Sequence, residues 1–336
     1  MNNFNKILIG ILVIGVLVLL PLFYHNKTSP TGAVVSEREK IMIAQGISPK
    51  TSPLIIAEEK GFFAEEGLNV EVKKFSAGRL ALDTLLSKDA QFAEVATIPI
   101  IGAGFNKQQI VVIATTTKTD NDIKVVARKD KGISKPQDLK NKKIATFLGT
   151  SSEIFTREFL KINGLKSNDV TIINLRPQEM PIALEREDID AYIIWEPFVY
   201  NGAKLLGDKA IVFSNDKIYR TTFNIVVNND FATKNPSTLK KFLRALIKSE
   251  NFIRKNRNES INIIAKSVDM DSSILNQVWN DYEFEVNLDK SLITVLEEEA
   301  EWALEIGTFS KTEIPNYRGM VYEDPLKEIA PKSVTI

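Results

Sequence analysis

Cysteine is absent from all 336 residues, and histidine occurs once, as His25. Without cysteine the chain forms no disulfide, holds no thiolate-bound metal and offers no cysteine nucleophile. Because His25 adjoins an apolar N-terminal run, the rest of the chain also lacks the imidazole that Ser-His-Asp catalysis and most zinc catalysis require. We therefore expect no catalytic residue, no metal site and no cofactor.

An excess of charge of either sign is also missing. The 43 basic and 43 acidic side chains give a formal net charge of +0. A nucleic-acid-binding protein needs a basic face, so we expect no nucleic acid among the partners. The length suits one large domain or two modest ones, each able to bury a core.

The N-terminus carries the one long apolar run. Residues 7–22 are almost wholly apolar and Phe23 and Tyr24 extend the run, which approaches the ~20 residues that a membrane-spanning helix needs. Residues 1–24 are therefore either a cleaved secretory signal or a transmembrane anchor. The run is long for a signal, and no convincing cleavage site follows it, which favours the anchor. Residues 25–39 have the composition of a flexible linker.

From Lys40 onward, strand-like and helix-like segments alternate. Strands are expected at 41–44, 70–72, 92–96 and 110–115, with helices at 54–66 and 80–88. A second alternating unit covers residues 144–213. Such alternation predicts parallel α/β sheets with right-handed crossovers.

Two apolar runs, Ile123–Arg128 and Phe223–Asn228, stand outside this alternation. We interpret them as strands that cross between two lobes. The first lobe then comprises 40–131 and 217–336, and the second comprises 132–216. From Ser237 onward the apolar residues recur at helical spacing, so the C-terminal part of the first lobe is expected to be helical.

The turn Gly149-Thr150-Ser151-Ser152 follows a predicted strand and opens a helix. Thr150 and Glu153 have the spacing of a capping box. The first turn of such a helix offers free N–H groups and hydroxyls, which favour an anion or a polar ligand. An ordinary capped helix with no ligand is the alternative.

Several short motifs occur in a specific order along residues 40–230, and the sharpest follows the strand at 191–195. They are Lys60-Gly61-Phe62-Phe63, Glu66-Gly67-Leu68-Asn69-Val70, Ser76-Ala77-Gly78, Thr97-Ile98-Pro99, Asp138-Leu139-Lys140, Gly149-Thr150-Ser151-Ser152, Asn163-Gly164-Leu165 and Trp195-Glu196-Pro197-Phe198. Together they resemble the solute-binding proteins of the nitrate, sulfonate and taurine type that serve ABC importers. The chain departs from this pattern at Lys88 and Glu187, where the family commonly has glycine, and at Gln91, where it usually has aspartate.

The resemblance implies a periplasmic-binding-protein-like fold of type II, with a small anionic or polar solute held between two α/β lobes. It also implies a monomer on the extracytoplasmic face of the membrane, tethered by the N-terminal helix, with the permease and ATPase subunits of an ABC importer as partners. Two alternatives stay open. One is a membrane-anchored sensor domain. The other is a pyrimidine synthase of thiamine biosynthesis, a relative that carries histidine and a cysteine-rich motif, both missing from the folded part here.

In open α/β sheets, ligands bind beyond the carboxyl ends of the strands. The loops predicted at these ends are rich in hydroxyl groups. Plain helix caps, a core tryptophan and a hinge-bracing glutamate are the structural alternatives, and Arg79 is either an anion partner or a solvated side chain. The predicted ligand-binding residues are Ser48, Thr51, Ser76, Gly78, Thr97, Thr115, Thr150, Ser151, Ser152, Trp195 and Glu196.

Overall fold

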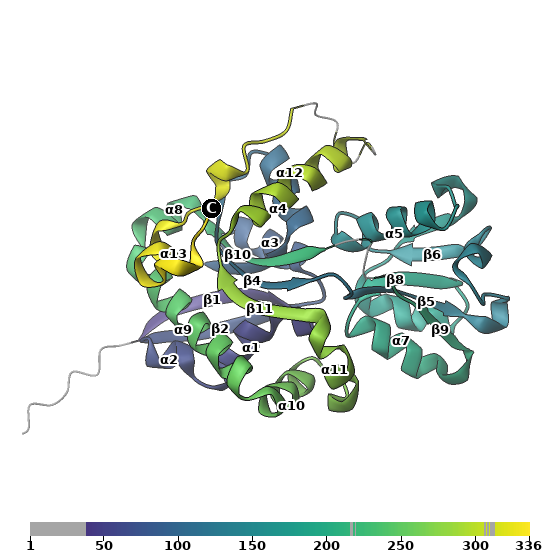
Figure 1. Cartoon of the computed structure of the whole chain (residues 1–336), viewed down its shortest axis with the longest axis horizontal. Coiled ribbons are helices and arrows are strands. Elements are labelled where there is room, and N and C mark those ends of the chain that lie inside the picture. The colour runs from purple at the N-terminus through teal and green to yellow at the C-terminus, as the bar shows by residue number, and fades with distance from the viewer. Residues whose placement is uncertain (1–37, 216–217, 219, 306, 308, 310–312) are drawn as a thin grey trace, which may run out of the picture. The chain divides into compact units, whose positions relative to one another are not determined.

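The computed structural model describes residues 38–336, apart from 216–217, 219, 306, 308 and 310–312 (Figure 1). The predicted anchor, residues 1–24, lies outside the described residues, as does the linker up to residue 37. Within the described part, no helix has both the length and the apolar character that a membrane span requires.

The first lobe is built on a mixed sheet in the order β11-β4-β10-β3-β1-β2. β1 pairs in parallel with β2 and β3, whereas β10 runs antiparallel to β3 and β4. The strands are β1 (Glu39–Gly46), β2 (Leu68–Phe75), β3 (Phe92–Ala96), β4 (Ile110–Thr119), β10 (Thr221–Asn228) and β11 (Tyr282–Asn287).

The second lobe has its own mixed sheet in the order β7-β6-β8-β5-β9. β6 pairs in parallel with β7 and β8, and β5 runs antiparallel to β8 and β9. The strands are β5 (Ile123–Arg128), β6 (Lys143–Thr146), β7 (Thr171–Asn174), β8 (Ala191–Trp195) and β9 (Ala210–Phe213).

The two strands that cross between the lobes explain why neither sheet is purely parallel, as the alternation had suggested. β5 and β10 arrive from the opposite lobe without a crossover helix to turn the chain, so each enters its new sheet antiparallel to its neighbours. Because β5 already belongs to the second sheet, the chain enters the second lobe between Thr119 and Ile123. The boundary predicted at residue 132 lies later in the chain.

Helices cover both sheets and dominate the end of the chain (Figure 1). The expectation of helices alone after Ser237 was wrong at β11, which adds an antiparallel edge strand beside β4. The helices are α1 (Ser52–Glu59), α2 (Phe62–Glu65), α3 (Gly78–Leu86), α4 (Thr97–Phe105), α5 (Ser151–Ile162), α6 (Met180–Glu185), α7 (Phe198–Leu206), α8 (Asn229–Lys234), α9 (Pro236–Lys255), α10 (Arg257–Ser267), α11 (Ser272–Val278), α12 (Lys290–Glu305) and α13 (Asp324–Ile329).

Each lobe has a separate hydrophobic core. In the first core, the rings of Phe92 on β3 and Phe242 on α9 stack with their centroids 4.0 Å apart. In the second core, Phe155 and Phe159 of α5 stack with centroids 5.8 Å apart. Each core also takes one buried residue from the other lobe, Ile154 in the first core and Ala77 in the second, so the lobes are in contact at their junction.

Candidate functional site

A cleft lies at the junction of the two lobes and holds about 390 Å³ of atom-free space, part of it open to solvent. Both lobes contribute to it, the first through the loops after β1, β2 and β3 and the second through the loops after β6 and β8. The cleft is lined by Gly46, Ile47, Ser48, Lys50, Ser76, Ala77, Gly78, Arg79, Ala96, Pro99, Thr150, Ser151, Trp195 and Phe223.

Three helices begin at this cleft. α3 starts at Gly78 and α5 starts at Ser151, and both residues line it. α4 starts at Thr97, between the lining residues Ala96 and Pro99. The N–H groups of a first helical turn have no partner within their helix and carry the positive end of the helix dipole. The cleft is therefore suited to a negatively charged group.

Two serine hydroxyls line the cleft without partners. Within the described part of the chain, the Oγ atoms of Ser76 and Ser151 are buried and have no hydrogen-bond partner. Buried hydroxyls are normally hydrogen-bonded. Ser76 belongs to the first lobe and Ser151 to the second, so each lobe offers one free hydroxyl to the cleft.

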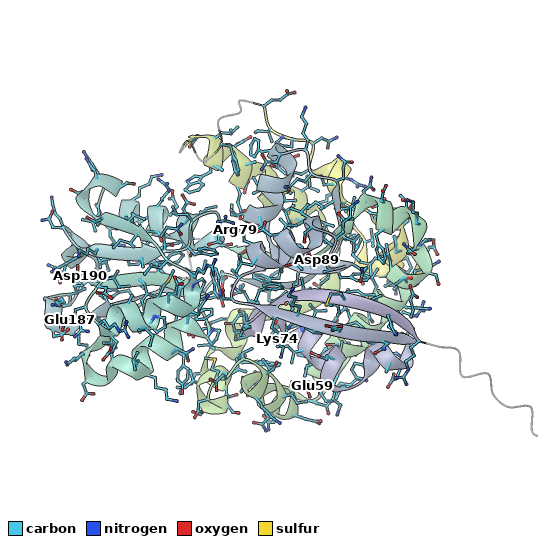
Figure 2. All side chains as sticks on the ribbon, turned by 180° about the vertical axis from the view of Figure 1, so that it is seen from behind. Glu59, Lys74, Arg79, Asp89, Glu187 and Asp190 are labelled. Atoms are coloured by element: carbon cyan, nitrogen blue, oxygen red, sulfur yellow. The ribbon has the colours of Figure 1, made fainter. Side chains whose placement is uncertain are left out.

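Arg79 reaches from the first lobe to the second, and Figure 2 shows it at the junction of the two. Its Nη1 atom donates a hydrogen bond of 2.8 Å to the carbonyl oxygen of Leu148. Its guanidinium also lies over the Phe147 ring, 5.4 Å from the centroid. Gly149 packs so closely that an added Cβ would lie 3.2 Å from Nη1. Arg79 is thus one wall of the cleft and a contact between the lobes.

Lys50 is a buried cation at the cleft, with 1% of its surface exposed. Its ammonium lies 4.9 Å from the centroid of the Trp195 ring and 4.5 Å from that of the Phe223 ring. Asp122 forms an ion pair with it, and Tyr282 donates a 2.9 Å hydrogen bond to the other oxygen of Asp122. Burial lowers the pKa of Lys50, while Asp122 opposes this shift.

Two further carboxyl groups lie buried near Lys50. Burial raises the pKa of Glu94 to about 8, although a hydrogen bond from Thr116 and the charge of Lys50 oppose the shift. Burial also raises the pKa of Glu196 to about 7, against a hydrogen bond of 2.9 Å from the backbone N–H of Tyr200. Both carboxyls hold a proton more readily than a solvated carboxyl does, which limits the negative charge beneath the cleft.

The model of the NMT1/THI5-like family matches residues 48–260, which is more than half of the chain and includes most of the cleft. The chain belongs to the NMT1/THI5-like family. This assignment and the two-lobe α/β fold confirm the family and the fold expected from the sequence motifs.

Relatives of this NMT1/THI5-like protein include a Bacillus subtilis (strain 168) protein named as an aliphatic sulfonates-binding protein. It is 28% identical over 278 residues, which cover 80% of this chain and 82% of the relative. The taurine-binding periplasmic protein of Escherichia coli (strain K12) is 28% identical over 222 residues, covering 65% of this chain and 68% of the relative.

Among solved structures, the alkanesulfonate-binding protein SsuA from Xanthomonas axonopodis pv. citri bound to MOPS superposes with a TM-score of 0.75. The sequences are 17% identical, and the superposition covers 86% of this chain and 99% of the other. At this identity the likeness establishes the fold alone.

Six of the eleven predicted ligand-binding residues line the cleft. Trp195 offers a ring face there, and Ser76 and Ser151 offer free hydroxyls. Thr150 lines the cleft, but its hydroxyl donates a 2.6 Å bond to the carbonyl oxygen of Phe147. The six are Ser48, Ser76, Gly78, Thr150, Ser151 and Trp195.

The other five predicted residues do not line the cleft. Thr115 donates a 2.7 Å bond to Asn224 inside the first lobe, and Glu196 accepts from a backbone N–H. Their polar atoms are engaged within the protein, so these residues support the loops around the cleft. The five are Thr51, Thr97, Thr115, Ser152 and Glu196. Ligand contact remains a prediction for all eleven.

The predicted capping box at α5 forms differently. Thr150 makes no side-chain cap of the helix, and Glu153 accepts a 2.8 Å hydrogen bond from the backbone N–H of Gly149 instead. Gly149 has a positive φ of 74°, which lets the chain turn sharply from β6 into α5. At the start of α5, the N–H of Glu153 donates a 3.0 Å hydrogen bond to the carbonyl oxygen of Thr150.

Sequence reasoning missed Lys50, Asp122 and Phe223. Lys50 lies in the loop that was expected to line the site, but a lysine in a loop is usually solvated. Asp122 is 72 residues away in the sequence and meets Lys50 only through the fold. The run Ser48-Pro49-Lys50-Thr51 carries no local pattern that marks Lys50 as buried.

Residues arranged to hold a metal ion are missing from the part of the chain that the structure describes: it contains no group of three or more His, Cys, Asp or Glu side chains suitably placed.

Proposed function

We propose that this NMT1/THI5-like protein is the extracytoplasmic solute-binding protein of an ABC importer, and that it holds a small organic anion of the sulfonate class. The observation that carries the proposal is the pair of unpartnered hydroxyls on facing lobes, Ser76 and Ser151. They stand at the starts of α3 and α5, where an anion is favoured by dipole and N–H groups together.

The other walls of the cleft favour an anion that carries a carbon chain. Ile47, Ala77, Pro99 and the rings of Trp195 and Phe223 line it. These surfaces suit an apolar group, because small-molecule sites combine apolar walls with a few placed polar groups. A sulfonate with a short alkyl tail satisfies both halves of the cleft, and the names of the Bacillus and Escherichia relatives point to the same class.

Closure of the lobes about the ligand is the proposed mechanism. The chain crosses between the lobes twice, between β4 and β5 and between β9 and β10. A ligand that touches both lobes binds the closed form more tightly than the open form, and this difference shifts the population toward closure. The protein then needs no chemical step, and the relatives compared above are binding proteins.

The remaining parts of the proposal concern location and partners. The apolar run at 7–24 supports an N-terminal anchor or signal that places the folded part outside the cytoplasm. A binding protein that carries one ligand in its closed form to the permease and its ATPase can act alone, so we propose that this protein is a monomer. Co-purification with a permease would support this arrangement, and co-purification with a kinase would favour the sensor interpretation instead.

Calorimetry on the full chain in mild detergent tests the function. The panel contains ethanesulfonate, butanesulfonate, taurine, nitrate and a pyrimidine. We expect saturable binding of at least one sulfonate, and at 100 times its dissociation constant the ligand should stabilise the fold by about 2.7 kcal/mol. If no sulfonate binds and another solute of the panel does, the sulfonate assignment is refuted.

A further inference from the structure

Three groups surround the ammonium of Lys50 and form what we call the ammonium cage: the rings of Trp195 and Phe223 and the carboxylate of Asp122. The ammonium lies 4.9 Å and 4.5 Å from the two ring centroids and pairs with the carboxylate. Tyr282 holds the second carboxylate oxygen through a 2.9 Å hydrogen bond. The cage is therefore preorganised, and Lys50 and the three residues around it are buried, with 1% to 6% of their surfaces exposed.

This combination is the one by which proteins recognise ammonium groups of ligands. A cation over an aromatic face is attracted by the ring quadrupole, most strongly where water is excluded. A buried carboxylate supplies the opposite charge. Lys50, Trp195 and Phe223 all line the same cleft as Ser76 and Ser151. Lys50 and the two rings of the cage thus border the space that a solute would enter, whereas Asp122 does not line it.

We propose that Lys50 fills the ammonium cage from within the chain, so that the cleft accepts organic anions without an amine and rejects zwitterionic aminosulfonates. The inference rests on the proposed function and narrows its substrate class. Lys50 is a specificity-determining residue in this account.

The charges around the cage explain the rejection. A ligand ammonium near the Trp195 ring would meet the like charge of Lys50 at close range, which is costly in a desolvated site. The Asp122 oxygens are already engaged by Lys50 and Tyr282. Glu94 and Glu196 are buried nearby and hold protons more readily than solvated carboxyls do, so they offer a second counter-ion only weakly.

The test compares the full wild-type chain with Lys50→Met, a neutral side chain of similar length, by calorimetry with three probes. The probes are ethanesulfonate, taurine, which is the same sulfonate with an amine, and ethylammonium, which has the amine without the sulfonate. In the wild type we expect ethanesulfonate to bind at least tenfold more tightly than taurine. In Lys50→Met we expect affinity for taurine and for ethylammonium to rise at least about tenfold.

The double variant Lys50→Met with Asp122→Asn is the matched control. It keeps the shape of the ammonium cage but removes its counter-charge, so the gain for the two amines should disappear. Circular dichroism checks that both variants are folded. If Lys50→Met does not fold, the wild-type ratio decides: equal affinities for ethanesulfonate and taurine overturn the proposal, and a ratio of tenfold or more supports it.

The outcomes also separate this inference from the proposed function. Binding of ethylammonium by Lys50→Met, with no sulfonate bound by either protein, would support the ammonium cage and refute the sulfonate assignment. Tight binding of ethanesulfonate by the wild type, with no gain for either amine in Lys50→Met, would overturn the ammonium cage and leave the proposed function standing.

Discussion

Arg79 at the start of α3 donates a 2.8 Å hydrogen bond to the carbonyl oxygen of Leu148, which follows β6 in the other lobe. A second bond joins the lobes at a distance from the cleft, where Trp302 of α12 donates to Glu158 of α5 at 2.9 Å. The two bonds restrain the lobes at separate points. Their loss should therefore favour open forms.

We predict that Arg79→Met opens the lobes and weakens ligand binding by about tenfold, because one charge-assisted bond is worth roughly 1.5 kcal/mol. Small-angle scattering should show a larger radius of gyration for the ligand-free variant, and calorimetry should show the weaker affinity. Arg254→Met is the control, since Arg254 pairs with Glu250 on the same helix. Scattering and affinity identical to the wild type would contradict a role for Arg79 in closure.

Local sequence patterns predicted the helix starts at the cleft because glycine and hydroxyl residues reveal a strand-to-helix turn within four residues. The turns at Ser76–Gly78 and Gly149–Ser152 are examples, and both contribute residues to the cleft. Strand direction was not predictable in this way. β10 runs antiparallel because it returns from the other lobe, a fact that its own residues do not encode.

The ammonium cage could not be predicted from the sequence for a related reason. Lys50, Asp122 and Phe223 come from three distant parts of the chain, and each residue type is ordinary in a loop or strand end. Their significance depends on mutual distance, which only the fold supplies. β11 was missed although Tyr282, Phe284 and Val286 alternate with polar residues, since the strong helical spacing on both sides dominated the interpretation.

Removal of an unpartnered hydroxyl should separate binding from stability. We predict that Ser76→Ala and Ser151→Ala each weaken sulfonate binding by about fivefold to tenfold. The free energy of unfolding without ligand should stay constant or rise slightly, because each change deletes a buried hydroxyl that has no partner in the described structure. Calorimetry and urea unfolding measure the two effects.

Ser152→Ala is the matched control for these serines. Ser152 accepts a 3.1 Å bond from Thr146 and should lose about 1 kcal/mol of stability on substitution. Its effect on affinity should be small, since it does not line the cleft. A stability loss in Ser76→Ala as large as that in Ser152→Ala would argue that Ser76 has a structural role instead.

Lys88, with φ of 67°, and Glu187, with φ of 66°, are two of the non-glycine residues in the left-handed region, and both lie in exposed turns. Glycine adopts this conformation without steric cost but loses more backbone entropy on folding. We predict that Lys88→Gly stabilises the fold by about 0.5 kcal/mol, measured by urea unfolding.

Glu187→Gly should gain less or destabilise, because Glu187 also pairs with Lys131 and with the buried Arg128. The comparison separates the backbone effect, common to both turns, from the ion pairs. If both glycine variants changed stability equally, the contacts of Glu187 would contribute nothing measurable.

The pH dependence of stability should show the buried Glu94. Its pKa is raised from 4.5 to about 8 in the folded chain, so the unfolded chain releases this proton at lower pH. The contribution is fully present below about pH 4.5 and is lost as the pH rises toward about 8, with an upper limit on the order of 5 kcal/mol. A proton on Glu94 would also supply a hydrogen-bond donor at this position. Without it, Glu94 Oε2 and Gln45 Oε1 are both buried acceptors that have no donor in the described structure.

Glu94→Gln tests this account, because an amide supplies a donor at every pH and does not titrate. We expect the wild type to lose stability between pH 5 and pH 8 in urea unfolding, and the variant to lose up to about 3.5 kcal/mol less over the same interval. Glu196, with a pKa raised to about 7, titrates in both proteins, so the difference between them isolates Glu94. The register that pairs Ala44 with Ala93 brings Gln45 beside Glu94, and Glu94→Ala, which leaves Gln45 without a donor, should be less stable than Glu94→Gln throughout. Parallel pH profiles for wild type and Glu94→Gln would contradict this account. They would show that Glu94 is ionised at neutral pH and that the ammonium of Lys50 has two carboxylates, Asp122 and Glu94, as counter-ions.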